Sequence, residues 1–421
     1  MFQKSVLNNG IRIVTATLNH CYSVNLSVFL GAGSRYETNE DGGAFHFIEH
    51  LCFKGTPRHP TSRAVSETIE RVGGYLNAAT QREMTNYWVK VARPYFDVAH
   101  DLLLDMLLHS LFEPEELEKE RNVVLEELSS TNDHPDSRLE QLIDEVVWPD
   151  QPMGRDVGGT EESVKGISRD RLLELMRRQY IPSNTVVTMV SNLAHDEVVE
   201  TLAPKLESWP VAAPLPWIPA KDGQQAARLK VEYRKTDQAH VGLALPGFPS
   251  THPDRYALDM LSIVLGEGMS SRLFAEVRDH RGLAYDIHSY TTHFQDTGAL
   301  MTYAATDPKN AAQALDVTLK ELAKMRDELV PDDELLKAKE LAKGRLVLRL
   351  EDPRSLGYWA GSHELLEGHV PPLEEIYAKL DAVTAADVQR VAGGVIATER
   401  LNLAVVGPFR SEQRFAKLLR V

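Results

Sequence analysis

The chain repeats its own pattern at about half its length. A proline opens a predicted long helix at Pro114, and another proline does so at Pro331. Further prolines follow these two helices at Pro135 and Pro353, so both pairs have almost the same separation along the chain. Landmarks of one kind that recur in the same order at nearly one offset are typical of an internal duplication. The 421 residues are therefore expected to fold as two similar domains.

A proline-rich segment, residues 209–229, separates the two copies. It contains Pro210, Pro214, Pro216 and Pro219. Proline removes backbone donors and fixes φ, so we predict an extended linker here. The linker leaves an N-terminal domain at residues 1–208 and a C-terminal domain at residues 230–421.

Both halves alternate short apolar runs with amphipathic segments. In the first half Val24–Leu30 is typical of a strand, and residues 43–53 of a helix. In the second half Val241–Leu245 predicts a strand and Tyr256–Leu265 a helix. Some neighbouring strands are joined by hairpin-sized loops. The pattern indicates an α+β fold of two tandem homologous domains, each a largely antiparallel sheet packed against helices.

The charge balance limits the partners of the chain. Lys and Arg number 46 and Asp and Glu number 61, so the net charge is −15. Residues 1–210 hold 20 basic and 32 acidic residues, a net charge of −12, and the rest of the chain a net charge of −3. A non-specific nucleic-acid binder normally carries a basic excess. We therefore expect no nucleic-acid partner.

Cysteine content and hydropathy bear on the compartment. Cys21 and Cys52 are the two cysteines, too few for a disulfide framework, which favours a reducing compartment. The first residues lack the apolar core of a signal peptide. No run of about 18 apolar residues is present. We expect a cytoplasmic protein without a membrane span.

His46, Glu49 and His50 lie within one predicted helix and form the pattern H-x-x-E-H. Histidines four residues apart project from one helix face, so both imidazoles can bind one Zn²⁺. Zinc lowers the pKa of a water, and a nearby carboxylate can accept its proton. We predict one Zn²⁺ per chain, held by His46 and His50, with Glu49 as the catalytic base. The alternative is a pair of packed or surface histidines beside a solvated glutamate.

A catalytic zinc needs a third protein ligand. The long acidic helix predicted from residue 113 to about 130 offers several carboxylates: Glu113, Glu115, Glu116, Glu118, Glu120, Glu126 and Glu127. Glu120 and Glu127 lie two turns apart on one face, and valines and leucines surround Glu127. A carboxylate beside apolar residues needs a partner, and a metal is one. The residues alone leave the choice among these carboxylates open.

Five stretches match a known family: residues 33–37, 46–56, 76–80, 265–274 and 281–285. By these the chain resembles the inverted-zincin metallopeptidase family of pitrilysin, insulin-degrading enzyme and mitochondrial processing peptidase, and is most similar to its short, single-half members. The distance along the chain from His50 to Glu127 equals the spacing of the family's third metal ligand. The resemblance therefore selects Glu127 as the ligand. It also implies that Glu120 supports the ligands from beside the site.

The resemblance implies further site residues. Arg278 and Tyr285 would bind the substrate and stabilise the oxyanion, which agrees with the need for donors where negative charge develops. From the residues alone they would be a surface arginine and a core tyrosine. Asn77 and Ala78 would contact a peptide that adds as a strand to the edge of the sheet. Their alternative is ordinary strand packing.

The second half lacks a copy of the metal motif. When its start is aligned on the first half without gaps, the three motif positions fall on Leu258, Leu261 and Ser262. One domain would thus carry the metal, and the other would help to hold the substrate. In the family two bowl-shaped halves enclose a chamber, so the resemblance implies a homodimer, or alternatively a heterodimer with a related chain. Arg278 and Tyr285 would then complete the site of the partner chain.

The predicted metal site and the family resemblance are consistent with two functions. The first is a zinc-dependent endopeptidase that hydrolyses unfolded or short peptides inside a dimeric chamber. The second is a non-catalytic or specialised partner subunit of a heterodimeric peptide-processing complex. The presence of His46, Glu49, His50 and Glu127 together favours the first, because a scaffold has no need of a base beside a metal.

Overall fold

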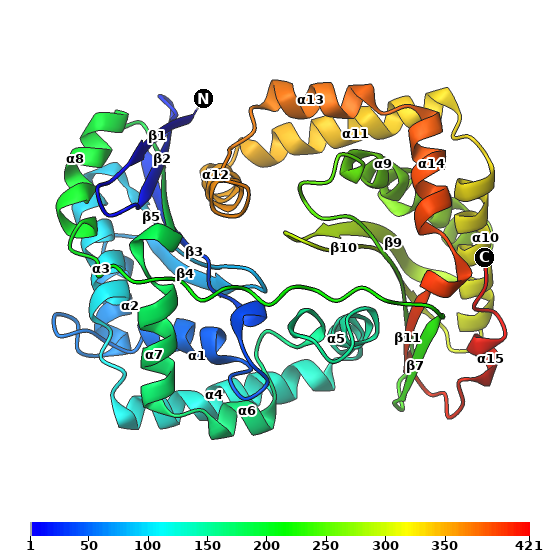
Figure 1. Cartoon of the computed structure of the whole chain (residues 1–421), viewed down its shortest axis with the longest axis horizontal. Coiled ribbons are helices and arrows are strands. Elements are labelled where there is room, and N and C mark those ends of the chain that lie inside the picture. The colour runs from blue at the N-terminus through cyan, green and yellow to red at the C-terminus, as the bar shows by residue number, and fades with distance from the viewer. Residues whose placement is uncertain (1) are drawn as a thin grey trace. The chain divides into compact units, whose positions relative to one another are not determined.

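The computed structural model describes residues 2–421, which form two compact units (Figure 1). Unit 1 comprises the chain up to Leu128, Asp156–Ile218 and Leu346–Pro372. Unit 2 comprises Ser129–Arg155, Pro219–Arg345 and Leu373–Val421. Each unit is built around one β-sheet with helices on both faces.

The sheet of unit 1 has the strand order β1-β2-β6-β3-β5-β4. Its strands are β1 (Phe2–Val6), β2 (Arg12–Thr17), β3 (Ser23–Leu30), β4 (Tyr75–Thr80), β5 (Thr85–Ala92) and β6 (Thr185–Ser191). β2 and β6 are parallel, and every other neighbouring pair is antiparallel. β4 pairs only with β5, so it is an edge strand whose outer backbone groups are open to another chain.

The sheet of unit 2 repeats this topology. Its order is β7-β11-β8-β10-β9, and its strands are β7 (Arg228–Tyr233), β8 (Ala239–Pro246), β9 (Ala284–His293), β10 (Gly298–Thr306) and β11 (Asn402–Gly407). The first pair is again parallel and the others are antiparallel. Position by position this matches β2-β6-β3-β5-β4. The α+β duplication predicted from the sequence is therefore confirmed in the topology, with β1 as an addition to unit 1.

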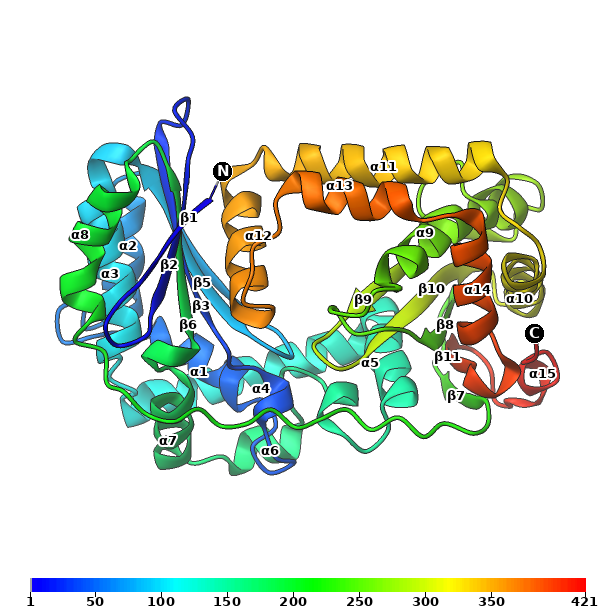
Figure 2. The ribbon, with the colours of Figure 1, turned by 45° about the horizontal axis from the view of Figure 1, so that its top comes forward.

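Helices cover both faces of the first sheet (Figure 2). On one face lie α1 (Ala44–Cys52), α2 (Ser62–Glu70), α3 (Phe96–His109) and α8 (His195–Leu206). Their apolar side chains, such as Phe45, Ile48 and Leu103, form one buried core with the inward residues of β3 and β5. On the opposite face lies α12 (Pro353–Leu366), which packs on β6 and β3.

The second sheet is covered in the same manner. On one face α9 (Arg255–Gly266) packs on β9, and α10 (Ala311–Asp327), α13 (Leu373–Ala382) and α14 (Ala385–Val395) pack against α9. On the other face α5 (Pro135–Val147) packs on β11 and β8. Leu139 and Ile143 of α5 are buried there against Ala244 and Ala404.

The contiguous domains expected at residues 1–208 and 230–421 differ from these two units. α5 belongs to the first half of the sequence but packs on the second sheet, and α12 belongs to the second half but packs on the first. The exchange arises because the unit boundaries fall inside two long helices, α4 (Pro114–Asp133) and α11 (Asp332–Leu350). Sequence periodicity shows that a helix has an apolar face, but not which sheet buries it.

Small residues let α12 lie close to its sheet. Gly357 and Gly361 are one turn apart on the buried face of the helix. A Cβ atom at Gly361 would lie 2.1 Å from the ring of Phe29, closer than any real contact. A Cβ atom at Gly357 would lie 3.4 Å from Oγ1 of Thr188 in β6. Thr188, and the residues paired directly with it on neighbouring strands, therefore face α12.

Short helices and irregular segments complete the fold. They include α6 (Glu161–Gly166), α7 (Arg169–Gln179) and α15 (Gln413–Ala416). Residues 210–225, within the proline-rich segment, form neither helix nor strand. Across residues 2–421, every helix is too short or too polar to cross a lipid bilayer.

Candidate metal centre

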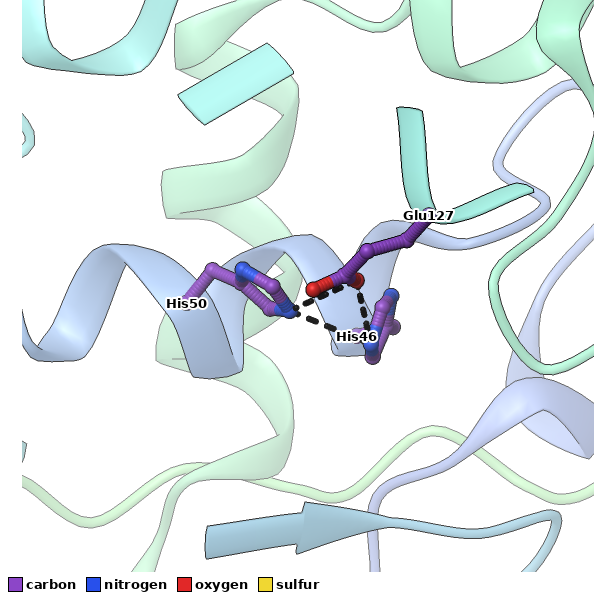
Figure 3. A group of neighbouring side chains, drawn as sticks. All are labelled: His46, His50 and Glu127. Atoms are coloured by element: carbon purple, nitrogen blue, oxygen red, sulfur yellow. Dashed lines mark hydrogen bonds and ion pairs between the residues drawn. The ribbon is translucent and has the colours of Figure 1, made fainter. Parts of the chain in front are cut away.

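His46 and His50 project from the same side of α1, as their spacing predicts (Figure 3). Their Nε2 atoms lie 3.2 Å apart. Glu127 reaches the same point from α4, with Oε2 at 3.8 Å from Nε2 of His46 and 3.5 Å from Nε2 of His50. All three ligand atoms lie within 4.8 Å of one another. The structure thus brings together the three residues predicted as metal ligands, and all of them belong to unit 1.

The donor set and its spacing fit a zinc ion. Ligand nitrogens about 2.0 Å from a tetrahedral zinc would lie about 3.3 Å apart, close to the observed separation of the two Nε2 atoms. Two imidazole nitrogens and one carboxylate are also a known ligand set of catalytic zinc, which leaves one position open. Three electron-pair donors that face one point repel each other unless a cation lies between them.

The neighbours of the two histidines shift their pKa values in opposite directions. Burial, together with the neighbouring charge of His50, lowers the pKa of His46 to about 4, so its imidazole is neutral near pH 7 and carries a free electron pair. Burial alone would lower the pKa of His50 as well. The hydrogen bond to Glu120 and the charges of Glu127 and Glu120 outweigh it, so this pKa is raised. The carboxylates around His50 therefore favour positive charge next to them.

Glu120 supports His50 from behind. Its Oε1 lies 2.8 Å from Nδ1 of His50, and its second carboxylate oxygen binds Nζ of Lys54. Burial would raise the pKa of Glu120, but these two contacts outweigh it and the pKa is lowered. An ionised Glu120 accepts a hydrogen bond from Nδ1–H of His50, which keeps the proton on Nδ1 and leaves the Nε2 electron pair free for a metal.

Replacing Glu120 with glutamine should weaken zinc binding by about 10- to 100-fold, because a neutral amide orients and polarises His50 less strongly. Competition with a chromogenic chelator measures the affinity. Glu116→Gln alters a partly exposed residue of the same helix, paired with Lys119, and is the matched control that should leave the affinity unchanged. Equal affinities of the two variants would contradict the supporting role of Glu120.

Glu49 lies beside the two histidines on α1 and is largely buried. Its Oε2 accepts a hydrogen bond from Oγ1 of Thr80, the last residue of β4. Burial raises the pKa of Glu49, and the hydrogen bond from Thr80 opposes that rise. A raised pKa makes a carboxylate a stronger base, which suits a proton acceptor near neutral pH. Nothing in the sequence indicated that Thr80 is a partner of Glu49, although Thr80 lies within the stretch 76–80 that matches the family.

A buried glutamate that the sequence analysis did not single out anchors α1. Glu37 accepts hydrogen bonds from the backbone N–H of Gly43 and of Phe45, both at 2.9 Å. These are N–H groups at the start of the helix that have no partner within it, and the helix dipole adds to the attraction. Gly43 adopts a left-handed conformation with φ of 85°, which glycine tolerates. The only signal for this role was the position of Glu37 in the stretch 33–37.

The predicted substrate strand is at the open edge of the sheet. Leu76 and Ala78 pack against the core on the α1 side, and Asn77 is exposed on the other side. The side-chain oxygen of Asn77 accepts a hydrogen bond from the N–H of Ala78 at 2.8 Å. A peptide that adds to this edge would compete with Asn77 for that N–H. Contact of Asn77 and Ala78 with a substrate stays a prediction.

Arg278 and Tyr285 lie together in unit 2. Arg278 is in a π-helical turn, Phe274–Asp279, and Tyr285 is the second residue of β9. The guanidinium of Arg278 lies 5.4 Å from the ring centre of Tyr285 and 4.7 Å from that of Phe274. Tyr285 is 75% exposed, so the alternative of a core tyrosine is wrong. Arg278 is partly exposed, and the part of both residues in catalysis stays a prediction.

Comparison with known proteins shows the family of the chain. Residues 12–161 match the family described as insulinase (peptidase family M16), and residues 166–341 match the peptidase M16 inactive domain. The chain belongs to peptidase family M16. An uncharacterized zinc protease of Streptomyces coelicolor is 36% identical over 98% of this chain and 90% of its own length. One from Bacillus subtilis is 35% identical over 97% of this chain and 98% of its own length.

Solved structures of M16 type share the fold. A protease from Helicobacter pylori superposes with a TM-score of 0.91 at 24% identity, over 97% of this chain and 99% of that one. A chain of complex III2 from Candida albicans superposes with a TM-score of 0.85 at 19% identity, over the full length of both. At these identities the likeness concerns the fold alone. The same fold thus occurs in a protease and in a chain of complex III2.

Proposed function

We propose that this chain is a zinc-dependent endopeptidase that hydrolyses unfolded or short peptides. The observation that carries the proposal is the convergence of His46, His50 and Glu127 on one point, with Glu49 on the same helix as the two histidines. M16 relatives named zinc proteases support a zinc peptidase. A scaffold has no use for a largely buried carboxylate of raised pKa beside such a point.

The side chains divide the work of hydrolysis. A zinc ion at His46, His50 and Glu127 would supply Lewis acidity, which lowers the pKa of water and polarises the scissile carbonyl. Glu49 accepts the proton of the attacking water and returns it to the leaving amine nitrogen. The hydrogen bond from Thr80 fixes one oxygen of Glu49 and leaves the other for this transfer.

Peptide binding uses the backbone of β4. A substrate in extended form adds to the open edge next to β4, so its main chain is held without strong sequence demand. Because Thr80 ends β4 and contacts Glu49, a strand bound along this edge runs toward the catalytic base. Folded proteins cannot present such a strand, which is why we expect unfolded or short peptides as substrates.

The proposed assembly is a homodimer that encloses a chamber. Arg278 and Tyr285 of one chain would donate to the substrate oxyanion at the metal centre of the other. One chain carries both sets of residues, so two complete sites per dimer are the simplest arrangement. A heterodimer with a related chain is the alternative, with this chain as a specialised or non-catalytic subunit. A cytoplasmic location stays a prediction from the cysteine content.

Metal analysis combined with a cleavage assay tests the proposal. The purified chain should bind one zinc ion and cleave an unstructured, internally quenched peptide. Removal of zinc with a chelator should abolish cleavage, and added Zn²⁺ should restore it. A zinc-loaded chain that cleaves no member of a diverse peptide mixture would favour the non-catalytic alternative. Cleavage that persists after verified removal of the metal would contradict zinc catalysis.

A further inference from the structure

Arg354 presents an unpaired charge on the sheet that carries the proposed substrate strand. It lies in the first turn of α12, is exposed, and its guanidinium stacks 4.1 Å from the ring centre of Trp88. No carboxylate within residues 2–421 lies within ion-pair distance of it. Stacking uses the flat face of the guanidinium and leaves its N–H donors free at the rim.

The register of the sheet places Arg354 in line with the open edge. Thr188, Ser27, Trp88 and Asn77 are directly opposite one another across four neighbouring strands. Residues paired in this way point to the same face, and Thr188 faces α12. Glu49 contacts the opposite face of the same edge strand through Thr80. Arg354 and Glu49 therefore lie on opposite faces of β4.

A peptide added to β4 would extend this row by one position. Side chains of a strand alternate between the two faces, so every second peptide residue points to the Arg354 side. The residue opposite Asn77 would lie two strand spacings, about 10 Å, from the backbone of Trp88. An arginine and a glutamate side chain together span such a distance.

Nearby acidic groups leave Arg354 available. Asp352 is engaged at the start of α12, where Oδ2 accepts a hydrogen bond from the N–H of Ser355 at 2.8 Å. Its other oxygen lies 3.9 Å from Nζ of Lys90. Glu351 is exposed and makes no ion pair with Arg354. The guanidinium is thus the cationic group stacked beside the row that ends at Asn77.

We propose that Arg354 forms a subsite that selects peptides with a glutamate or aspartate opposite Asn77. This proposal rests on the proposed function, because it assumes that a peptide adds to the edge of β4. The planar guanidinium binds a carboxylate through two parallel N–H groups. A glutamine or lysine side chain in the peptide lacks the two carboxylate oxygens and cannot form this pair. This selection for acidic peptides would oppose the general attraction of basic peptides by the net charge of −15 of the protein.

Cleavage kinetics test the subsite. A quenched peptide carries Glu, Gln or Lys at one position, which is moved stepwise through the sequence. The wild-type chain should prefer Glu over Gln by about fivefold in kcat/KM at one position, as for an exposed ion pair, and less at high salt. The two adjacent positions point to the other face and should show no such preference. Equal rates for Glu and Gln at every position would overturn the proposal.

Variants assign the preference to one side chain. Arg354→Gln should reduce the ratio of Glu to Gln rates to about 1, and Arg354→Glu should make the Lys peptide the preferred one. Arg349→Gln removes an exposed guanidinium from the last turn of α11 and is the matched control, which should keep the ratio. A ratio that survives Arg354→Gln would assign the preference to another residue.

Binding separates this proposal from the proposed function. In the Glu49→Gln background, fluorescence anisotropy of labelled peptides measures affinity without turnover. The Glu peptide should bind about fivefold more tightly than the Gln peptide, and Arg354→Gln should remove the difference. Equal affinities, or no binding of either peptide, would overturn the subsite. Absence of cleavage by the wild-type chain together with the expected affinities would overturn only the proposed function.

Discussion

Replacing Glu49 with glutamine should lower kcat for peptide hydrolysis by about 10³-fold, while the chain still binds one zinc ion. Glutamine keeps the size of the side chain and can still accept the hydrogen bond from Thr80, but it cannot take a proton from water. The three predicted ligands, His46, His50 and Glu127, are unchanged. Zinc content and single-turnover cleavage of a quenched peptide together measure both effects.

A neighbouring carboxylate provides the control for this prediction. Glu126→Gln alters an exposed residue next to Glu127, and the zinc content and kcat should both remain at wild-type level. Undiminished cleavage by Glu49→Gln would remove Glu49 from the role of base. Loss of zinc in that variant would instead show that Glu49 takes part in metal binding. Loss of zinc in Glu126→Gln would reopen the choice of the third ligand.

Mixing two inactive variants should restore activity if the site is shared between two chains. Glu49→Gln lacks the base, and Tyr285→Phe lacks a proposed oxyanion donor, which should cost about 10²- to 10³-fold in kcat. After exchange of subunits about half of the dimers are mixed, and one of the two sites in each is intact. The mixture should therefore recover about a quarter of the wild-type rate.

The mixing experiment also has a clear negative outcome. Native mass spectrometry shows whether mixed dimers form, independently of activity. Mixed dimers without recovered cleavage would contradict completion of the site by the partner chain. A chain that stays monomeric and active would contradict the dimeric chamber as a whole. The exposure of Tyr285, 75%, is what makes its contact with a second molecule physically reasonable.

Local features of the site were predictable because helical spacing alone fixes them. The spacing of His46 and His50 places both imidazoles on one face of α1 whatever the rest of the chain does. The repeated strand and helix pattern likewise predicted two similar sheets. The match of β7-β11-β8-β10-β9 to β2-β6-β3-β5-β4 bears this out. Such features depend on residues close together in the sequence, or on an internal repeat that is visible in the sequence.

Contacts between distant segments were not predictable in this way. The residues left several carboxylates open as the third ligand, and only a family spacing selected Glu127. The capping of α1 by Glu37 and the hydrogen bond from Thr80 to Glu49 depend on where loops and strands meet. Polar side chains of these types occur throughout the chain, and their partners are chosen by the packing around them.

The sequence by itself determined the duplication, the α+β class and the pair of histidines, because each is written in a short-range pattern or a constant offset. The tertiary structure decided which sheet each helix buries: α5 and α12 exchange units because α4 and α11 cross the unit boundaries. It also decided that Arg354 stacks on Trp88 beside the open edge. The hydrophobic effect drives an apolar helix face to be buried but does not specify which distant segment buries it. Packing partners far apart in the sequence are therefore set only when the whole fold packs.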